Sequence, residues 1–320
     1  MMNATEITRL TVKLADNQQS LQLAGPRDVH LYWLEQRMDV KITAQGNYLS
    51  ISGEALNCKA TQQLIDSVLT QSKGRDLETE DFETALRFLQ SAEDGDTLHE
   101  GLRWKIWSKI VTAKSPAQEN YMRILMEKEL VFGLGPAGTG KTFLAVARAL
   151  QLLFRGEVER LIISRPAVEA GEKLGFLPGD FKEKVDPYMR PIYDALFELA
   201  GRKQCERYME QGTIEIAPLA FMRGRSLKRA FVILDEAQNT TAMQMKMFLT
   251  RLGKGSRMVV NGDLSQIDLP PHTPSGLHDA CTRLEPLEEV GIARFSNRDS
   301  IRHNLVAKIL EAYGNDNAPR

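Results

Sequence analysis

One segment of the chain fits the pattern G-x-x-x-x-G-K-[ST] in full, namely Gly135-Pro136-Ala137-Gly138-Thr139-Gly140-Lys141-Thr142. It follows an apolar run at 130–134 and precedes a stretch of helical character at 143–153, which is the setting of a phosphate-binding loop. The glycines let backbone N–H groups approach phosphate oxygens, and the following helix adds its positive end. In such a loop Lys141 meets the β- and γ-phosphates and Thr142 offers a hydroxyl to Mg²⁺. The segment predicts a nucleoside triphosphate site, with a chance glycine-rich turn as the alternative.

A second segment offers carboxylates for the metal. Four apolar residues at 231–234 are typical of a buried parallel strand, and Asp235 and Glu236 follow them directly. Because open α/β sheets bind ligands at the carboxyl ends of their strands, we expect Asp235 beside the phosphate loop. Asp235 would hold Mg²⁺ through water, and Glu236 would orient and deprotonate the attacking water. The alternative is a strand that ends in a solvated acidic turn.

Two glutamines extend the predicted site. Gln266 follows another apolar strand, at 257–262, and its carboxamide can sense the γ-phosphate or position water. Gln118 precedes the first strand within a helix-like segment, and its donor and acceptor suit the edge of adenine. The expected ligand is therefore ATP with Mg²⁺. Taken singly, each glutamine is also typical of a turn or a helix cap.

The order of these segments resembles the nucleotide-binding core of superfamily-one helicases. It more closely resembles the PhoH-like ATPase family, in its bacterial YbeZ branch. The resemblance is strong from 116 to 313 and weak over the first hundred residues. The segments that carry it are 115–118, 135–142, 165–179, 234–239, and 262–263 together with 266–270.

The resemblance implies an ATPase with one RecA/helicase-type domain, an RNA-related role and association with a YbeY-type endoribonuclease. The first hypothesis is an enzyme that couples Mg²⁺-dependent ATP hydrolysis to RNA handling as an oligomer. The second is a nucleotide-gated adapter that presents a surface to such a ribonuclease without moving RNA. A small-molecule kinase is a third class, and Asp235-Glu236 followed by Ala237-Gln238, as in helicases, speaks against it.

The chain has only one phosphate-loop pattern, and about 85 residues follow Asp235. Helicases of this type use a second domain to bring arginines to ATP, and an arginine supplied by a partner increases phosphoryl-transfer rates by roughly 10³–10⁵. We therefore expect a homo-oligomer, such as a ring, in which each subunit completes its neighbour's site. Arg302 is the preferred arginine, with an ordinary surface arginine as the equal alternative.

From length and sequence pattern, we expect the 320 residues to form three regions, 1–72, 73–114 and 115–320. We expect a small α/β domain at 1–72 that is similar to KH-type modules, with RNA binding and a structural adapter role both open. A linker at 73–114 contains the segment 103–110, where cations and aromatics interleave. That segment either stacks bases or forms an edge strand with packed tryptophans.

The region 115–320 is predicted to be an α/β P-loop ATPase domain with a mostly parallel sheet. Its strands are expected near 129–134, 160–164, 213–217, 230–235, 257–262 and 289–295. The insert between 165 and 201 carries prolines at 166, 178, 187 and 191, which are expected to prevent one continuous helix.

The formal net charge of −1 gives no global attraction to nucleic acid. The three cysteines form no C-x-x-C pair, and no run of eighteen apolar residues occurs. We expect a cytoplasmic protein with no membrane association.

Overall fold

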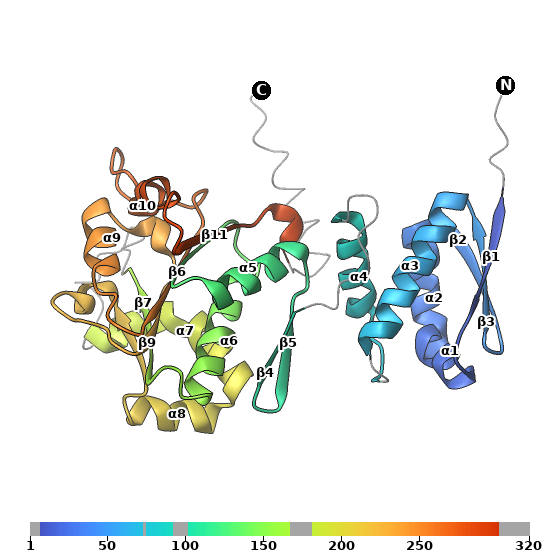
Figure 1. Ribbon diagram of the computed structural model, residues 1–320, viewed down its shortest axis with the longest axis horizontal. Helices are drawn as coiled ribbons and strands as arrows, with labels where there is room; N and C mark the ends of the chain where they lie inside the picture. Colours follow the sequence, from blue (N-terminus) through green and yellow to red (C-terminus); the bar gives the residue numbers. More distant parts are fainter. Residues whose placement is uncertain (1–6, 73–74, 92–101, 167–180, 301–320) are drawn as a thin grey trace. The chain divides into compact units, whose positions relative to one another are not determined.

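The computed structural model describes residues 7–72, 75–91, 102–166 and 181–300. The chain forms two compact units (Figure 1). The first comprises residues 1–100 with 114–116, and the second comprises residues 101–113 with 117–320. The region 73–114, predicted as a linker, is divided between them. None of the helices that the structure describes is both long enough and apolar enough to cross a lipid bilayer.

The first unit has a three-stranded antiparallel sheet in the order β1-β3-β2. Its strands are β1 (Thr8–Lys13), β2 (Val40–Gln45) and β3 (Tyr48–Gly53). Its helices are α1 (Asn17–Ala24), α2 (Val29–Met38), α3 (Ala55–Ser72) and α4 (Thr79–Ser91). Helix α4 packs on α2 and α3, where the Phe82 side chain is fully buried.

Helix α1 was not predicted from the sequence, because its residues are mostly polar. The Asp16 side chain caps it by accepting the Gln19 N–H at 2.8 Å. The likeness of this unit to KH-type modules remains a prediction.

The second unit contains a six-stranded sheet in the order β11-β6-β10-β9-β7-β8, and all its strand pairs are parallel. This confirms the α/β fold with a parallel sheet, and the six expected strands agree with those observed to within a residue or two. They are β6 (Leu130–Leu134), β7 (Arg160–Arg165), β8 (Ile214–Pro218), β9 (Ala230–Leu234), β10 (Arg257–Gly262) and β11 (Val290–Arg294).

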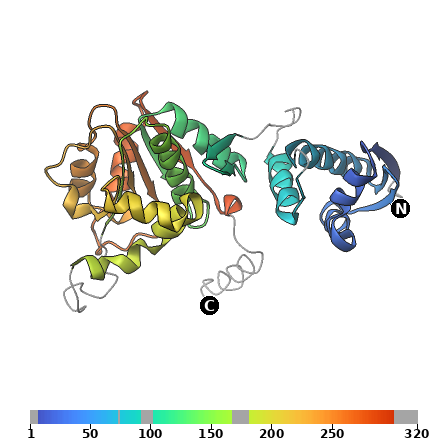
Figure 2. The ribbon, with the colours of Figure 1, turned by 90° about the horizontal axis from the view of Figure 1, so that it is seen from below.

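Helices cover both faces of this sheet (Figure 2). Helices α6 (Lys141–Phe154), α7 (Phe181–Ala200) and α8 (Arg202–Glu210) pack in succession, and α9 (Ala242–Leu249) packs on α10 (Gly276–Leu284). Helix α5 (Pro116–Glu127) precedes β6. A hairpin of β4 (Arg103–Ile106) and β5 (Lys109–Thr112) packs on α6.

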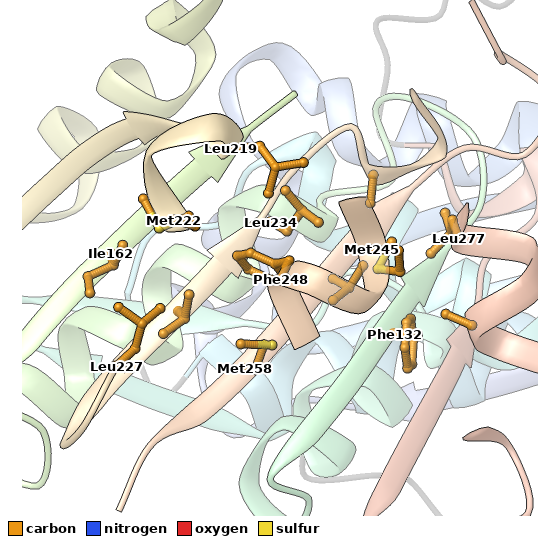
Figure 3. Packing of buried hydrophobic residues seen from close by; sticks show 14 of the residues in the cluster. Phe132, Ile162, Leu219, Met222, Leu227, Leu234, Met245, Phe248, Met258 and Leu277 are labelled. Atoms are coloured by element: carbon orange, nitrogen blue, oxygen red, sulfur yellow. The ribbon is translucent and has the colours of Figure 1, made fainter. Parts of the chain in front are cut away.

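The hydrophobic core on the α9–α10 side draws residues from many elements (Figure 3). Phe132, Leu234 and Met258 come from neighbouring strands, and Phe248 and Leu277 come from the two helices that cover them. All five side chains are fully buried. At roughly 1.5–3 kcal/mol for each large apolar side chain, their burial is what holds the carboxyl ends of the strands in place.

Helix α7 begins at Phe181 within the insert and continues through Pro187 and Pro191, so these two prolines do not interrupt it. Each proline removes one N–H from the helical ladder. The helix persists because Ile192, Leu196 and Leu199 lie in the core at no more than 3% exposure. Tertiary packing here outweighs local preference.

A buried hydrogen bond joins α5 to the centre of the sheet. The Tyr121 hydroxyl donates to Asn261 Oδ1 at 2.7 Å, and both side chains are fully buried. A Cβ atom at Gly133, on the neighbouring strand, would lie 2.4 Å from Asn261 Oδ1, so glycine leaves room for this pair. The pair thus packs against Gly133, two residues before the predicted phosphate loop begins at Gly135.

We predict that Tyr121→Phe destabilises the protein by about 1–3 kcal/mol, the usual cost of leaving a buried acceptor unsatisfied. Denaturant unfolding followed by circular dichroism measures the change. The matched control is Tyr48→Phe, because the Tyr48 side chain is 46% exposed and its replacement should change stability little. Equal effects of the two substitutions would contradict the assigned role of the Tyr121–Asn261 bond.

Candidate nucleotide site

The loop between β6 and α6 has a backbone that requires glycine. Gly138 and Gly140 have φ angles of 80° and 83°, in the left-handed region that side chains disfavour. At Gly140 a Cβ atom would also lie 2.6 Å from Gln118 Nε2. The loop therefore follows a path that brings backbone close to a bound anion, at the N-terminus of a helix of 14 residues.

Lys141 is held within this loop. Its Nζ atom donates to the carbonyl oxygens of Gly135 and Pro136, both at 2.7 Å, and to Thr139 Oγ1 at 3.2 Å. The Thr139 hydroxyl in turn donates to the Pro136 carbonyl at 3.0 Å. An ammonium group surrounded by loop carbonyls lies where phosphate oxygens would be its stronger partners. These residues fit a polyphosphate.

Thr142 and Asp235 join the loop to the end of β9. The Thr142 hydroxyl donates to Asp235 Oδ1 at 2.7 Å, and the Asp235 side chain is buried. Burial raises the pKa of the Asp235 carboxyl above its ordinary value, while the hydrogen bond from Thr142 and the charges of Arg165 and Lys141 oppose the rise. A hydroxyl beside a carboxylate is a donor set that suits Mg²⁺ with phosphate oxygens and water. Within the described ranges, this site included, no group of three or more His, Cys, Asp or Glu residues is arranged to hold a metal ion.

Glu236 is held on both sides of its carboxylate. Arg165 Nη2 lies 3.0 Å from its Oε1 atom, and Gln238 Nε2 donates to its Oε2 atom at 2.6 Å. The Glu236 backbone has a φ angle of 53°, which is uncommon for a residue other than glycine. The candidate base is thus restrained in the nucleotide-free protein.

Gln238 connects this acidic segment to the loop after β10. Its Oε1 atom accepts the Asp263 N–H at 3.0 Å, and its Nε2 atom also donates to the Gln266 carbonyl at 3.2 Å. The Gln266 side chain donates to Asp263 Oδ2 at 2.8 Å. Gln266 is therefore positioned by its own loop, and buried Gln238 determines how that loop meets Glu236.

These groups surround a cavity of about 430 Å³, within the range of roughly 300–1,000 Å³ usual for ligand pockets. Of the predicted site residues, Ala137, Gly138, Gly140, Lys141, Thr142, Asp235, Glu236 and Gln266 line it. Arg165 and the α7 residues Asp194 and Glu198 also line it, and none of the three was among the predicted site residues. Only the spacing of four between the two α7 carboxylates hinted that they share one helix face.

Gln118 lies beneath the loop. Its Nε2 atom donates to the Thr139 carbonyl at 3.0 Å, and the side chain is only 2% exposed. The carboxamide thus supports the conformation of the loop, and the recognition of adenine by Gln118 remains a prediction. Arg302 lies outside the described residues.

The predicted cation–aromatic segment forms the β4–β5 hairpin. Trp104 is buried against α6, which confirms the packed-tryptophan alternative for this residue. Trp107 stacks on Phe154 with ring centroids 4.5 Å apart and remains 47% exposed. The hairpin is thus anchored to the C-terminal end of α6, whose N-terminal end forms part of the cavity.

The chain matches the model of one protein family, described as PhoH-like protein, over residues 110–314. It is 45% identical to a PhoH-like protein of Bacillus subtilis (strain 168) over 309 residues, which cover 95% of this chain and 97% of the relative. It is 48% identical to Protein PhoH of Escherichia coli (strain K12) over 205 residues, or 63% of this chain and 58% of that protein. Among solved structures, the chain is similar to a Sulfolobus solfataricus SWI2/SNF2 ATPase core in complex with dsDNA. The match covers 56% of this chain and 42% of that chain, with a TM-score of 0.32 and 13% sequence identity. This similarity is too remote to support an inference.

The buried carboxyl generates a stability prediction. Because the pKa of Asp235 is raised in the folded protein, its contribution to stability is complete below the unfolded pKa and is lost as pH rises through the folded pKa. The raised pKa therefore makes the fold less stable at neutral pH than at acidic pH. We expect Asp235→Asn to raise the melting temperature in EDTA at pH 7.5, and the gain to shrink toward pH 4.

The same variant should bind nucleotide at least about tenfold more weakly in Mg²⁺, a loss of about 1.4 kcal/mol. Asp279→Asn is the control, since Asp279 is a surface residue paired with Arg283. A lower melting temperature for Asp235→Asn than for the parent at pH 7.5 would show that the carboxylate stabilises the fold.

Proposed function

The chain belongs to the PhoH-like protein family, and from this premise we propose that it binds ATP with Mg²⁺ and hydrolyses the γ-phosphate. One observation carries the proposal. Lys141, Thr142, Asp235 and Glu236 come from two segments far apart in the sequence, and all four line a single cavity. If the glycine-rich turn served only the fold, it would not need an acidic strand end beside it. The same holds for the acidic strand end without the turn.

Each residue has a distinct task in this proposal. Lys141 neutralises phosphate charge from within the loop, and the loop N–H groups orient the phosphates. Thr142 and Asp235 hold Mg²⁺, which when bound draws charge from the phosphates. Glu236 accepts a proton from the attacking water once its carboxylate is free to do so.

We further propose that hydrolysis is coupled to RNA, on the strength of the resemblance to superfamily-one helicases. The alternative is an adapter that uses the nucleotide to control its contact with a YbeY-type endoribonuclease. Hydrolysis that RNA stimulates would favour the first function. Hydrolysis that the ribonuclease stimulates and RNA does not affect would favour the second.

Lys141→Ala tests the central claim. Hydrogen bonds to charged groups contribute roughly 1.5–3 kcal/mol, so we expect ATP affinity or turnover to fall by about 10- to 100-fold. Equilibrium binding of a fluorescent nucleotide and release of phosphate measure the two quantities. Lys254→Ala replaces an exposed lysine and serves as the control. A folded Lys141→Ala protein with unchanged binding and turnover would remove the claim.

The predicted oligomer can be tested through Arg302. If this arginine completes a neighbour's site, Arg302→Ala should bind ATP normally but hydrolyse it poorly. Mixing Arg302→Ala with Lys141→Ala should restore part of the activity, because mixed oligomers then contain some sites with both groups intact. Exchange of subunits is verified beforehand with fluorescently labelled protein. Absence of rescue after verified exchange would argue against Arg302.

A further inference from the structure

Arg165 is the last residue of β7 and lines the cavity. The proposed binding of phosphates and metal gives it no role. Its side chain is 19% exposed and forms an ion pair with Glu236 at 3.0 Å. Gln238 occupies the second oxygen of the same carboxylate. Both oxygens of the candidate base are therefore engaged by protein donors.

This engagement limits how freely Glu236 can act as a base. A carboxylate has about four lone-pair sites, so each oxygen keeps one for water, but the ion pair with Arg165 holds the side chain in place and competes with the water for Oε1. The Gln238 amide also bonds to the loop after β10 and is buried, so it is fixed on that side. The ion pair with Arg165 is the contact that a ligand would replace, because Arg165 lines the cavity and Gln238 does not.

The charges around the cavity indicate where the guanidinium would go. The described residues that line the cavity include only two cations, Lys141 and Arg165, against several carboxylates. The carboxylates are Asp194, Glu198, Asp235, Glu236 and Asp263. Lys141 is bonded within the phosphate loop, whereas Arg165 comes from the end of β7 and is paired with Glu236. A guanidinium forms charge-assisted bonds to phosphate as well as to carboxylate, so a phosphate that enters the cavity would compete with Glu236 for Arg165.

We propose that Arg165 is a positioning residue that couples the presence of a terminal phosphate to release of the base. Without a triphosphate, Arg165 holds Glu236 Oε1. With a triphosphate in the cavity, the guanidinium bonds to the terminal phosphate and Glu236 Oε1 becomes free to accept a proton from water. A diphosphate lacks the group that competes for Arg165, so the base stays restrained. This inference rests on the proposed ATPase function.

The backbone of Glu236 agrees with such a restraint. A non-glycine residue in the left-handed region costs roughly 1–3 kcal/mol and persists where its surroundings hold it. Here the Asp235 N–H donates to the Ser164 carbonyl at 2.9 Å, and the Asn239 N–H donates to the Glu236 carbonyl at 3.1 Å. The main chain is fixed on both sides of Glu236, so a change of partner is confined to the side chain.

The test measures nucleotide preference without turnover. The affinities of the full chain for ADP and for an imido-linked, non-hydrolysable ATP analogue are determined in Mg²⁺ by calorimetry, for the parent, Arg165→Ala and Arg165→Lys. We expect Arg165→Ala to bind ADP within about twofold of the parent and the analogue about tenfold more weakly, which corresponds to about 1.4 kcal/mol. Arg165→Lys should fall between them, because an ammonium keeps the charge and loses the fork.

The matched control is Arg225→Ala. Arg225 pairs with Glu215 at 2.6 Å, is similarly half-buried and does not line the cavity. Its replacement should leave the ratio of the two affinities unchanged, even if it lowers the melting temperature. A purely structural role for Arg165 would give the same result as this control.

A second measurement asks whether Arg165 acts through the base. In single-turnover hydrolysis at saturating ATP, Arg165→Ala removes the restraint on Glu236, so it should not slow a protein that contains Glu236 and should leave the rate of Glu236→Gln unchanged. An unchanged affinity ratio in Arg165→Ala, or in Arg165→Lys should the alanine variant not fold, would overturn the inference. If the parent bound nucleotide independently of Lys141, the ATPase proposal would fall as well. Lys141-dependent binding with an unchanged ratio would remove only the role of Arg165.

Discussion

The hydrogen bond between the Thr142 hydroxyl and the Asp235 carboxylate is the contact on which the candidate site depends. It joins the loop after β6 to the end of β9, and β10 lies between these strands in the sheet. Parallel strands bring their carboxyl ends to one edge, and the register along β10 places the ends of β6 and β9 two residues apart. The core beneath α9 and α10 holds the three strands together. A loop and a carboxylate 93 positions apart thereby come within 2.7 Å of each other.

The cost of the site is visible in the same residues. Asp235 is buried, which raises its pKa and opposes the charge that a metal requires. Gly135 leaves no room for a side chain, since a Cβ atom there would lie 2.5 Å from the Phe295 carbonyl oxygen. Glu236 has an unfavourable backbone conformation. Such features are typical of sites where stability is given up for function, and the large apolar core offsets them.

The site is also a connected set of bonds. Gln238 connects the base with the loop after β10, and Arg165 connects it with β7. In the proposed function, a change at the phosphates of the nucleotide would therefore affect the base through side chains that are already in contact. The α7 wall, with Asp194 and Glu198, makes the far side of the cavity negative, so the position of each cation matters to what binds there.

The sequence alone determined the parts that depend on local pattern. The spacing of glycines with Lys141 identified the phosphate loop, and apolar runs of strand length located all six strands of the parallel sheet. Asp235 and Glu236 were found because a strand end is where such sheets bind ligands. The residues that make up each of these signals lie within a few positions of one another, so local backbone geometry relates them directly.

Only the tertiary structure decided which distant side chains meet. It placed Gln118 beneath the loop, Gln238 between two loops, and Arg165 on Glu236. It also carried α7 through two prolines, because the burial of its apolar face outweighs the lost hydrogen bonds. Contacts of this kind depend on how helices and strands pack, and packing energies are shared among residues that no local pattern links. The sequence therefore predicted the candidate groups of the site, and the fold decided the partners that restrain them.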